Sequence, residues 1–196
     1  SDFINMENAF NALNECGISG NVTLSIVSGS YNGLSITGAI KGTDDTTTVT
    51  ITSSASYADS VIFEGSPALS LLNTAYLSFK NVTFNTKSGG HAVLFNGITN
   101  NIEISHCNIY ADPTGTVTSS SGIYKGASSI ASNIRINANN IDGGYYGVYL
   151  YGTSSQYVQN VTIDSNILNN QFYYGILNYY VNTTSISYNT VEARSI

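Results

Sequence analysis

Apolar and polar residues alternate in short runs along most of the chain, and the runs recur. In each run two residues flank one polar position, so their side chains would face the same side of a β-strand. Successive runs begin 23 to 32 residues apart. A period of this length, without a recurrent helical pattern, predicts a β solenoid with stacked coils. The pairs are Val22/Leu24, Val49/Ile51, Leu77/Phe79, Ile102/Ile104, Ile134/Ile136, Val161/Ile163 and Thr184/Ile186.

Three further columns follow the same period. One apolar column, often preceded by glycine, contains Leu69, Val93, Ile123, Val148 and Ile176. A second contains Phe84, Ile109, Ile141, Leu168 and Val191. A third, placed at a turn, contains Val82, Cys107, Asn139, Asn166 and Asn189. Asparagine suits a sharp turn, and stacked asparagines can donate from one coil to the next. We therefore expect about seven coils, spaced ~4.8 Å apart, around an inward asparagine column.

The first twenty residues have a different pattern, with apolar residues three and four positions apart. This spacing predicts an amphipathic helix that Asp2 would cap and Gly17 would end. A helix over residues 1–20 would cover the open strand edges of the first coil of a solenoid at residues 21–196. The apolar residues of the helix are Phe3, Met6, Phe10 and Leu13.

The repeat pattern continues into the last residues, which read SISYNTVEARSI. A stack that stops there leaves its last coil open. We therefore expect the natural chain to continue beyond residue 196, or another module or subunit to cover the last coil.

The chain is poor in charge, and charged residues make up 9 % of it, against about 25 % in an ordinary soluble domain. Six basic and twelve acidic residues give a net charge of −6. Without a basic patch the chain is not expected to bind nucleic acid, and no apolar run is long enough to span a membrane. A surface of hydroxyl and amide groups is typical of extracellular proteins. The two cysteines, Cys16 and Cys107, are expected to be unpaired and buried.

Several segments resemble the right-handed parallel β-helix of the pectate-lyase-like superfamily, among them NIEISHCNIY and NIRINANNIDGGYYGVYLYG. The opening FNALNECGISGNVTLSIVSGSYN is similar to the N-terminal cap and first coil of large secreted β-helix proteins of Bacteroidota. The resemblance implies an all-β solenoid, a right-handed parallel β-helix of about seven coils with an N-terminal capping α-helix. It also implies a secreted or cell-surface location. This fold carries lyases, hydrolases and non-catalytic adhesins alike, so it does not imply one activity.

The same resemblance suggests two modification sites. Bacteria of this group O-glycosylate Asp-Ser/Thr-apolar and Asp-Thr-Thr triplets, and Thr46 and Ser60 lie in such triplets. Lyases of the superfamily use a cation, a base and often clustered carboxylates that hold calcium. If the chain were such a lyase, some of its carboxylates would have to lie close together.

No predicted column places two carboxylates in adjacent coils. Glu103 and Arg135 lie beside each other on neighbouring coils and are expected to form a surface ion pair. A lyase would recruit Arg135, His106 and Glu103, and this alternative remains open. Neither His91 nor His106 has an evident partner, and both are expected to be plain surface or turn residues. We expect no metal and no cofactor.

The chain has fifteen tyrosines and no tryptophan. If Val148 and Ile176 point inward, Tyr149 points outward, with Tyr124 stacked below it. Rings repeated coil by coil would form a flat amphipathic wall that stacks on sugar rings or packs against a protein. The residues of this predicted wall are Tyr124, Tyr146, Tyr149, Tyr151, Tyr174 and Tyr179.

These patterns favour a non-catalytic module of a secreted or cell-surface protein, a scaffold or adhesin that contacts a polysaccharide or a surface protein through its tyrosines. The first alternative is a carbohydrate-active enzyme, specifically a polysaccharide lyase. The second is a structural spacer or oligomer subunit with its tyrosines buried under loops.

Overall fold

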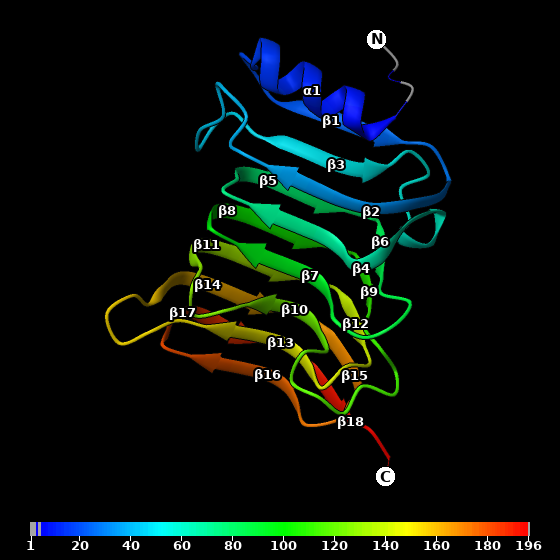
Figure 1. The fold of residues 1–196 in the computed structure, drawn as a ribbon, viewed down its shortest axis with the longest axis vertical. Coiled ribbons are helices and arrows are strands. Elements are labelled where there is room, and N and C mark those ends of the chain that lie inside the picture. Colours follow the sequence, from blue (N-terminus) through cyan, green and yellow to red (C-terminus); the bar gives the residue numbers. More distant parts are fainter. Residues whose placement is uncertain (1–2, 4, 196) are drawn as a thin grey trace.

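The computed structural model describes residues 3 and 5–195, which form one α-helix, one short 3₁₀ helix and eighteen β-strands. Figure 1 shows the helix at one end and the strands stacked beneath it. All pairs between the named strands of this part of the chain are parallel. The chain is therefore mainly β and parallel, as the repeat predicts.

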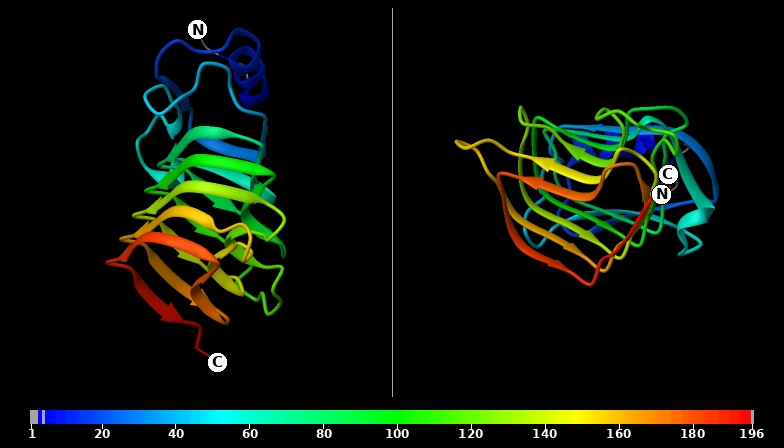
Figure 2. Two further views of the ribbon diagram at one scale, coloured as in Figure 1. Left: turned by 90° about the vertical axis from the view of Figure 1, so that its left-hand side faces the viewer. Right: turned by 90° about the horizontal axis from the view of Figure 1, so that it is seen from below.

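The first sheet contains seven strands, one from each coil, where a coil is one circuit of the chain around the stack (Figure 2). Their order along the sheet is their order in the chain. The predicted apolar pairs lie in register, and Ile102 pairs with Leu77 on one side and Ile134 on the other. The strands are β1 (Val22–Ile26), β3 (Val49–Ser53), β5 (Ala75–Lys80), β8 (Ile98–Ser105), β11 (Ile130–Asn137), β14 (Val158–Asp164) and β17 (Val181–Ser187).

The second sheet contains eleven strands and divides at its longest strand, β4 (Val61–Leu72). The first half of β4 pairs with β6 and the second half with β7, while β2 (Gly29–Thr37) pairs with both halves. On one side of β4 the sheet forms an arm of four strands: β7 (His91–Asn96), β10 (Ser121–Lys125), β13 (Tyr146–Tyr151) and β16 (Tyr174–Tyr179). On the other side of β4 a second arm has five strands: β6 (Thr83–Asn85), β9 (Asn108–Tyr110), β12 (Asn140–Asp142), β15 (Ile167–Gln171) and β18 (Thr190–Ala193).

The predicted apolar columns fill the space between the sheets. Val93, Ile123 and Val148 stack in register and are fully buried. Phe79 of the first sheet meets Phe84 of the second edge to face, with ring centroids 5.8 Å apart. One continuous apolar core therefore runs along the stack.

The asparagine column is present and lies inside. The side-chain amide of Asn166 donates to Oδ1 of Asn189 at 2.9 Å and to the carbonyl of Ile136 at 3.0 Å. Its Oδ1 accepts from the backbone N–H of Asn139 at 3.0 Å. In the coil before Asn139, the buried Cys107 occupies the same position, and its N–H donates to Oδ1 of Asn139. The column ties the ends of β8, β11 and β14 to the next coil.

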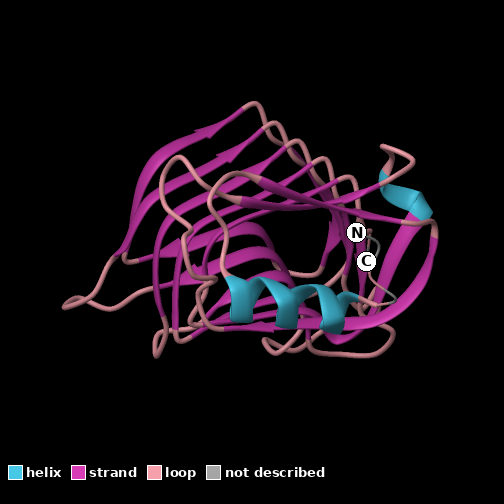
Figure 3. Cartoon of the chain, turned by 90° about the horizontal axis from the view of Figure 1, so that it is seen from above, coloured by secondary structure: helices cyan, strands magenta, loops and turns pink. Residues whose placement is uncertain are grey.

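The helix α1 spans Met6–Cys16 and lies across the end of the stack (Figure 3). Phe10 and Leu13 are buried against the core, and the helix ends at Gly17 with a φ of 69°. The N-cap is Asn5, whose side chain accepts from the N–H of Asn8; the predicted cap, Asp2, lies outside the described residues. Phe3 is 43 % exposed, so the predicted apolar face of the helix is one residue shorter.

Two further expectations need correction. Val161 pairs with Thr183 rather than Thr184, because β14 and β17 shift register on both sides of Val161, whereas Ile163 pairs with Ile186 as expected. Both cysteines are free, but Cys16 is exposed at the end of α1, and only Cys107 is buried. The alternation of β17 is too polar to define its register, so sequence alone placed Thr184 one position off.

The strands of the last coil, β16, β17 and β18, each lie at an end of their sheet or sheet arm. Ile186 is 48 % exposed and Val191 is 53 % exposed, although both continue inward columns. Whether further chain or another subunit covers this coil stays a prediction. Among the described residues no helix has the length and apolar character needed to cross a membrane.

Candidate functional surfaces

Strand register brings the predicted tyrosines together on one sheet arm. Tyr124 of β10 pairs with Tyr149 of β13, and Tyr149 is followed two residues later by Tyr151. Across the next coil boundary, two further pairs join β13 to β16. We call these residues the tyrosine surface: Tyr124, Tyr146, Tyr149, Tyr151, Tyr174 and Tyr179.

Gly147 explains how Tyr146, the first residue of β13, joins this surface. A Cβ on Gly147 would lie 2.5 Å from the carbonyl oxygen of Gly175 and 2.8 Å from Leu168 of β15. The chain thus approaches the opposite arm too closely for any side chain. Because Gly147 and Val148 both face the interior, the ring of Tyr146 lies on the outer side, with its centroid 4.6 Å from that of Tyr149.

The six rings form one contact network. The rings of Tyr124 and Tyr149 lie 5.5 Å apart and are tilted by 60°. Tyr149 and Tyr151 are 5.9 Å apart and nearly parallel, at 10°. Tyr151 meets Tyr179 edge to face at 5.3 Å. The rings are therefore contiguous, but the wall is not flat as the sequence suggested.

The six rings differ in how much of each is exposed to solvent. Tyr174 is 44 % exposed and Tyr179 is 50 % exposed, whereas Tyr124, Tyr149 and Tyr151 are half-buried. Tyr146 is only 7 % exposed, so it supports the surface and does not present a ring to solvent. This corrects the expectation that all six rings are exposed.

Sequence reasoning missed several aromatic neighbours of this surface. Tyr145 packs against Tyr146, and Tyr173 packs against Tyr174, at 4.7 and 4.3 Å. Tyr157 lies on the loop between β13 and β14, which projects from the stack in Figure 2, and contacts Tyr180 at 5.5 Å. The paired tyrosines at 145–146, 173–174 and 179–180 were the available signal.

His91 belongs to the same surface, contrary to the expectation of a plain surface residue. It begins β7, and its ring stacks on Tyr124 at 4.0 Å and 9°. Burial lowers the pKa of His91 to about 4. Burial, followed by the neighbouring Tyr146, also raises the pKa of Tyr149. Both rings are therefore uncharged at neutral pH.

Lys125 lies beneath the tyrosine surface, inside the core. It is 1 % exposed, and its Nζ donates to the carbonyl of Tyr151 at 2.9 Å. It has no ion-pair partner among the described residues, and burial lowers its pKa to about 8. The apolar side chains of Phe95 and Leu150 occupy the same position on the neighbouring strands. The alternation places Lys125 two residues after the inward Ile123, on the same face of β10, but its charge is typical of an outward residue.

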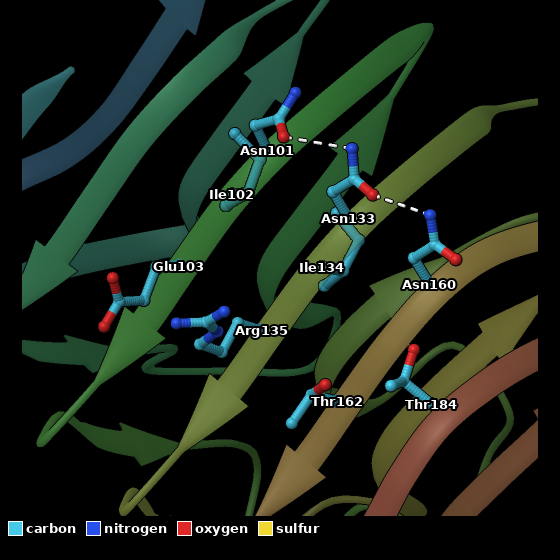
Figure 4. A pocket seen from close by; sticks show the side chains of 9 residues that line it. All are labelled: Asn101, Ile102, Glu103, Asn133, Ile134, Arg135, Asn160, Thr162 and Thr184. Atoms are coloured by element: carbon cyan, nitrogen blue, oxygen red, sulfur yellow. Dashed lines mark hydrogen bonds between the residues drawn. The ribbon is translucent and has the colours of Figure 1, made fainter. Parts of the chain in front are cut away.

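A second candidate surface lies on the first sheet, where the structure has a shallow hollow of about 390 Å³ (Figure 4). It extends across four coils, from β8 to β17, on the outer face of the sheet. Amide and hydroxyl groups supply most of its polar lining, together with one acid and one base. The lining residues are Asn101, Ile102, Glu103, Asn133, Ile134, Arg135, Asn160, Thr162 and Thr184.

Two of the three residues of the lyase alternative line this hollow. Glu103 and Arg135 are register partners, as predicted. They do not form the expected ion pair, because Glu103 instead binds Nζ of Lys80 at 3.3 Å and accepts from Ser78 and Ser105. His106 is exposed at the bend after β8, with a φ of 55°, and does not line the hollow.

The two predicted modification sites differ in access. Thr46 is exposed in the loop before β3, where its N–H and hydroxyl both donate to Asp44 at 2.8 Å. These hydrogen bonds lower the pKa of Asp44. Ser60 is 9 % exposed, and its hydroxyl bonds to Ser53 and donates to the carbonyl of Tyr57. A sugar on Ser60 would require this corner to open, whereas Thr46 is accessible.

Comparisons of the chain with protein-family models, with curated proteins and with solved structures find no match. The functional argument therefore rests on the two surfaces.

Proposed function

We propose that the chain is a non-catalytic binding module that holds a glycan against the tyrosine surface. The observation that carries the proposal is the contiguity of its rings. Six tyrosines from three coils contact one another, while two of them remain about half exposed. Soluble monomers seldom leave a large aromatic patch uncovered without a binding role.

The chemistry of the surface favours a glycan over a protein partner. Tyrosine presents an apolar ring face to the C–H groups of a sugar and a hydroxyl to its oxygens. The rings come from three neighbouring coils, spaced ~4.8 Å apart, so a chain ligand can contact more than one coil. The half-buried rings are held by their neighbours, so little side-chain freedom is lost on binding.

The finer description of the fold belongs to this proposal. Strands that pair with those one coil away, an inward asparagine column and a helix over the first coil support a right-handed parallel β-helix. We propose that it resembles the pectate-lyase-like proteins and acts outside the cell, on a secreted or surface-attached protein. The low charge and the many surface hydroxyls and amides support that location.

The test is native gel electrophoresis of the protein in gels containing neutral or acidic polysaccharides. We expect retardation by a neutral polysaccharide, and a loss of affinity of about fivefold in Tyr179→Ala, since one ring contributes about 1 kcal/mol. Tyr149→Ala should weaken it as well. Tyr188→Ala is the matched control, because Tyr188 is 90 % exposed and makes no contact within the tyrosine surface.

Equal retardation of the wild type and both surface variants would contradict the proposal. The same samples should be followed by ultraviolet absorbance for unsaturated sugars. Product that disappears in Arg135→Ala would replace the binding proposal with the polysaccharide-lyase alternative. If no polysaccharide retards the protein, the spacer alternative and a protein partner take precedence.

A further inference from the structure

A hollow of about 600 Å³ lies between the helix α1 and the strand β2, at the helical end of the stack, where α1 lies above β2 in Figure 1. Residues 31–37 all line it, although Leu34 and Ile36 are buried while Ser35 and Thr37 are exposed. Successive side chains of a strand alternate between its two faces. A hollow lined by both sets therefore opens on the edge of β2, where the backbone groups lie.

The edge of β2 that faces this hollow has no partner strand. Within the described residues, β2 pairs with β4 and with no other strand. The N–H of Gly38 donates to the carbonyl of Leu72 in β4, so the backbone groups of every second residue before Gly38 also face β4. The N–H and C=O groups of Ser35 and Thr37 therefore point the other way, into the hollow.

The helix forms the opposite wall of the hollow but does not pair with this edge. One face of α1 lines the hollow, with residues three and four positions apart, among them Glu7, Phe10 and Asn14. No hydrogen bond joins α1 to β2 in the described part of the chain. An unpaired strand edge presents a row of donors and acceptors to which another extended chain can add.

The side chains around the hollow add selectivity to this edge. Phe10, Leu34 and Phe63 are buried and supply apolar surface to its lining. Glu7 is exposed and is the one charged residue among the described lining residues, and no ion pair joins it to another described residue. A strand beside β2 directs alternate side chains to opposite faces. A segment that alternates apolar and basic residues therefore fits both the apolar lining and Glu7.

We propose that this hollow binds an extended segment of a partner protein, which adds to β2 as a further strand and carries alternating apolar and basic side chains. Main-chain hydrogen bonds to Ser35 and Thr37 supply the affinity, and the apolar lining and Glu7 supply the selectivity. The hollow is at the helical end of the stack and shares no residue with the tyrosine surface, so the inference does not depend on the function proposed for that surface.

Charge distinguishes a foreign segment from a second copy of this chain. The strands at the ends of the two sheets and their arms contain no lysine or arginine, so none of them complements Glu7. These strands are β1, β2, β16, β17 and β18. The favoured occupant is therefore a basic segment of another protein.

The experiment uses a capped hexapeptide of alternating valine and lysine and measures amide hydrogen exchange by NMR. In the free protein the N–H groups of Ser35 and Thr37 should exchange freely, whereas that of Ile36, which faces β4, should be protected. Saturating peptide should slow exchange at Ser35 and Thr37 by about tenfold or more. Two further peptides, N-methylated at every valine or at every lysine, each lack the donors of one edge, and at least one of them should give no protection.

Variants test the edge and the charge separately. Ser35→Pro should abolish protection of Thr37 by the peptide, because proline is tolerated in an edge strand where its missing N–H faces away from the neighbouring strand. Glu7→Gln should weaken binding by up to about fivefold, as the loss of an exposed ion pair does. Glu15→Gln is the matched control, because Glu15 is exposed on the same helix and does not line the hollow.

The absence of peptide-dependent protection in the wild type would overturn the inference, as would full protection by both N-methylated peptides. Equal binding of a hexapeptide of alternating valine and glutamate would overturn the assignment to a basic segment. Protection of Ser35 and Thr37 without peptide, in a protein that sediments as a dimer, would make a second copy the occupant instead. Thermal melting confirms that each variant is folded, and the N-methylated peptides test the pairing on the unaltered protein.

Discussion

The side-chain amide of Asn139 donates to the side-chain oxygen of Asn166 at 3.0 Å, across a coil boundary inside the protein. The same oxygen accepts the backbone N–H of Asn139. Asn166 is fully buried, so no water can replace either bond. One amide therefore satisfies two donors of one coil and links it to the next.

Asn166→Ala should be strongly destabilising. It removes the acceptor of the Asn139 backbone N–H and of one side-chain N–H, and it removes a donor to the carbonyl of Ile136; each buried group left unpaired costs about 1–3 kcal/mol. We expect the free energy of unfolding to fall by at least about 2 kcal/mol in urea titrations. Asn11→Ala, on the exposed side of α1, is the control and should change it little. Equal losses in the two variants would argue against the column as a stabilising element.

Gly147→Ala should destabilise the protein by steric conflict. Its Cβ would lie 2.5 Å from a backbone oxygen, which cannot move without separating β13 from β16. We expect a lower melting temperature and weaker contact between Tyr146 and Tyr149, visible in near-ultraviolet circular dichroism. Gly20→Ala is the matched control, because nothing lies within 4 Å of its added Cβ. A melting temperature equal to that of the control would contradict the close approach.

Lys125→Met should stabilise the protein at neutral pH. The pKa of Lys125 is about 8 when folded and about 10.4 in an unfolded chain. The folded form therefore binds fewer protons between these values, and stability falls as pH drops from about 10.4 to 8. The advantage of Met should be largest below pH 8 and shrink as pH rises toward 10.4. Parallel urea titrations of both proteins across this range measure it, and an advantage independent of pH would refute the ionic cause.

His91 should make the protein sensitive to acid. Its folded pKa of about 4 lies below the 6.5 of an unperturbed histidine. Between these values the unfolded chain binds more protons, so the contribution of His91 to stability declines as pH falls from 6.5 to 4. His91→Phe keeps a ring against Tyr124 and should lose less stability over this interval. The carboxylates titrate in both proteins, so the difference between their stabilities at each pH reports the contribution of His91 alone. Identical pH profiles of stability would contradict the prediction.

The two cysteines should differ sharply in reactivity. Burial raises the pKa of the Cys107 thiol to about 12, whereas Cys16 is exposed at the end of α1. A thiol reagent should therefore label one cysteine in the native protein and two in denaturant. Cys16→Ser should abolish native labelling, and mass spectrometry of the labelled peptides identifies the site. Rapid native labelling of Cys107 would show that the interior opens at that coil.

Alternation and period predicted most of the architecture. Ile102, Ile134 and their equivalents lie in the expected register, because a period-2 apolar pattern places a whole strand on one face. The asparagine column followed from the same reasoning, since a residue repeated at one turn must stack on itself. Where the pattern faded, at Thr184, the register was wrong by one residue.

The tyrosine surface was predicted in its membership but not in its shape. Register sufficed to bring Tyr151 beside Tyr179, since both follow from strand pairing. Ring tilt and the burial of Tyr146 depend on packing around Gly147, which no linear pattern reports. His91 joined the surface through a stack with Tyr124, three positions further along the neighbouring strand register.

Which residues stack on which follows from the amino-acid pattern, because the repeat length and the apolar alternation leave one consistent register for most strands. The pairing of charges and polar groups across that register depends on the folded structure. Arg135 is the register partner of Glu103, and Lys80 lies on the strand at the other side. Glu103 forms its ion pair with Lys80. The alternation places Lys125 at an inward position, although its charge is typical of a surface residue. The carbonyl of Tyr151 accepts a hydrogen bond from its Nζ there. The side of a strand that a residue faces depends on its own position in the alternation, whereas the environment of a charge depends on atoms from several coils at once.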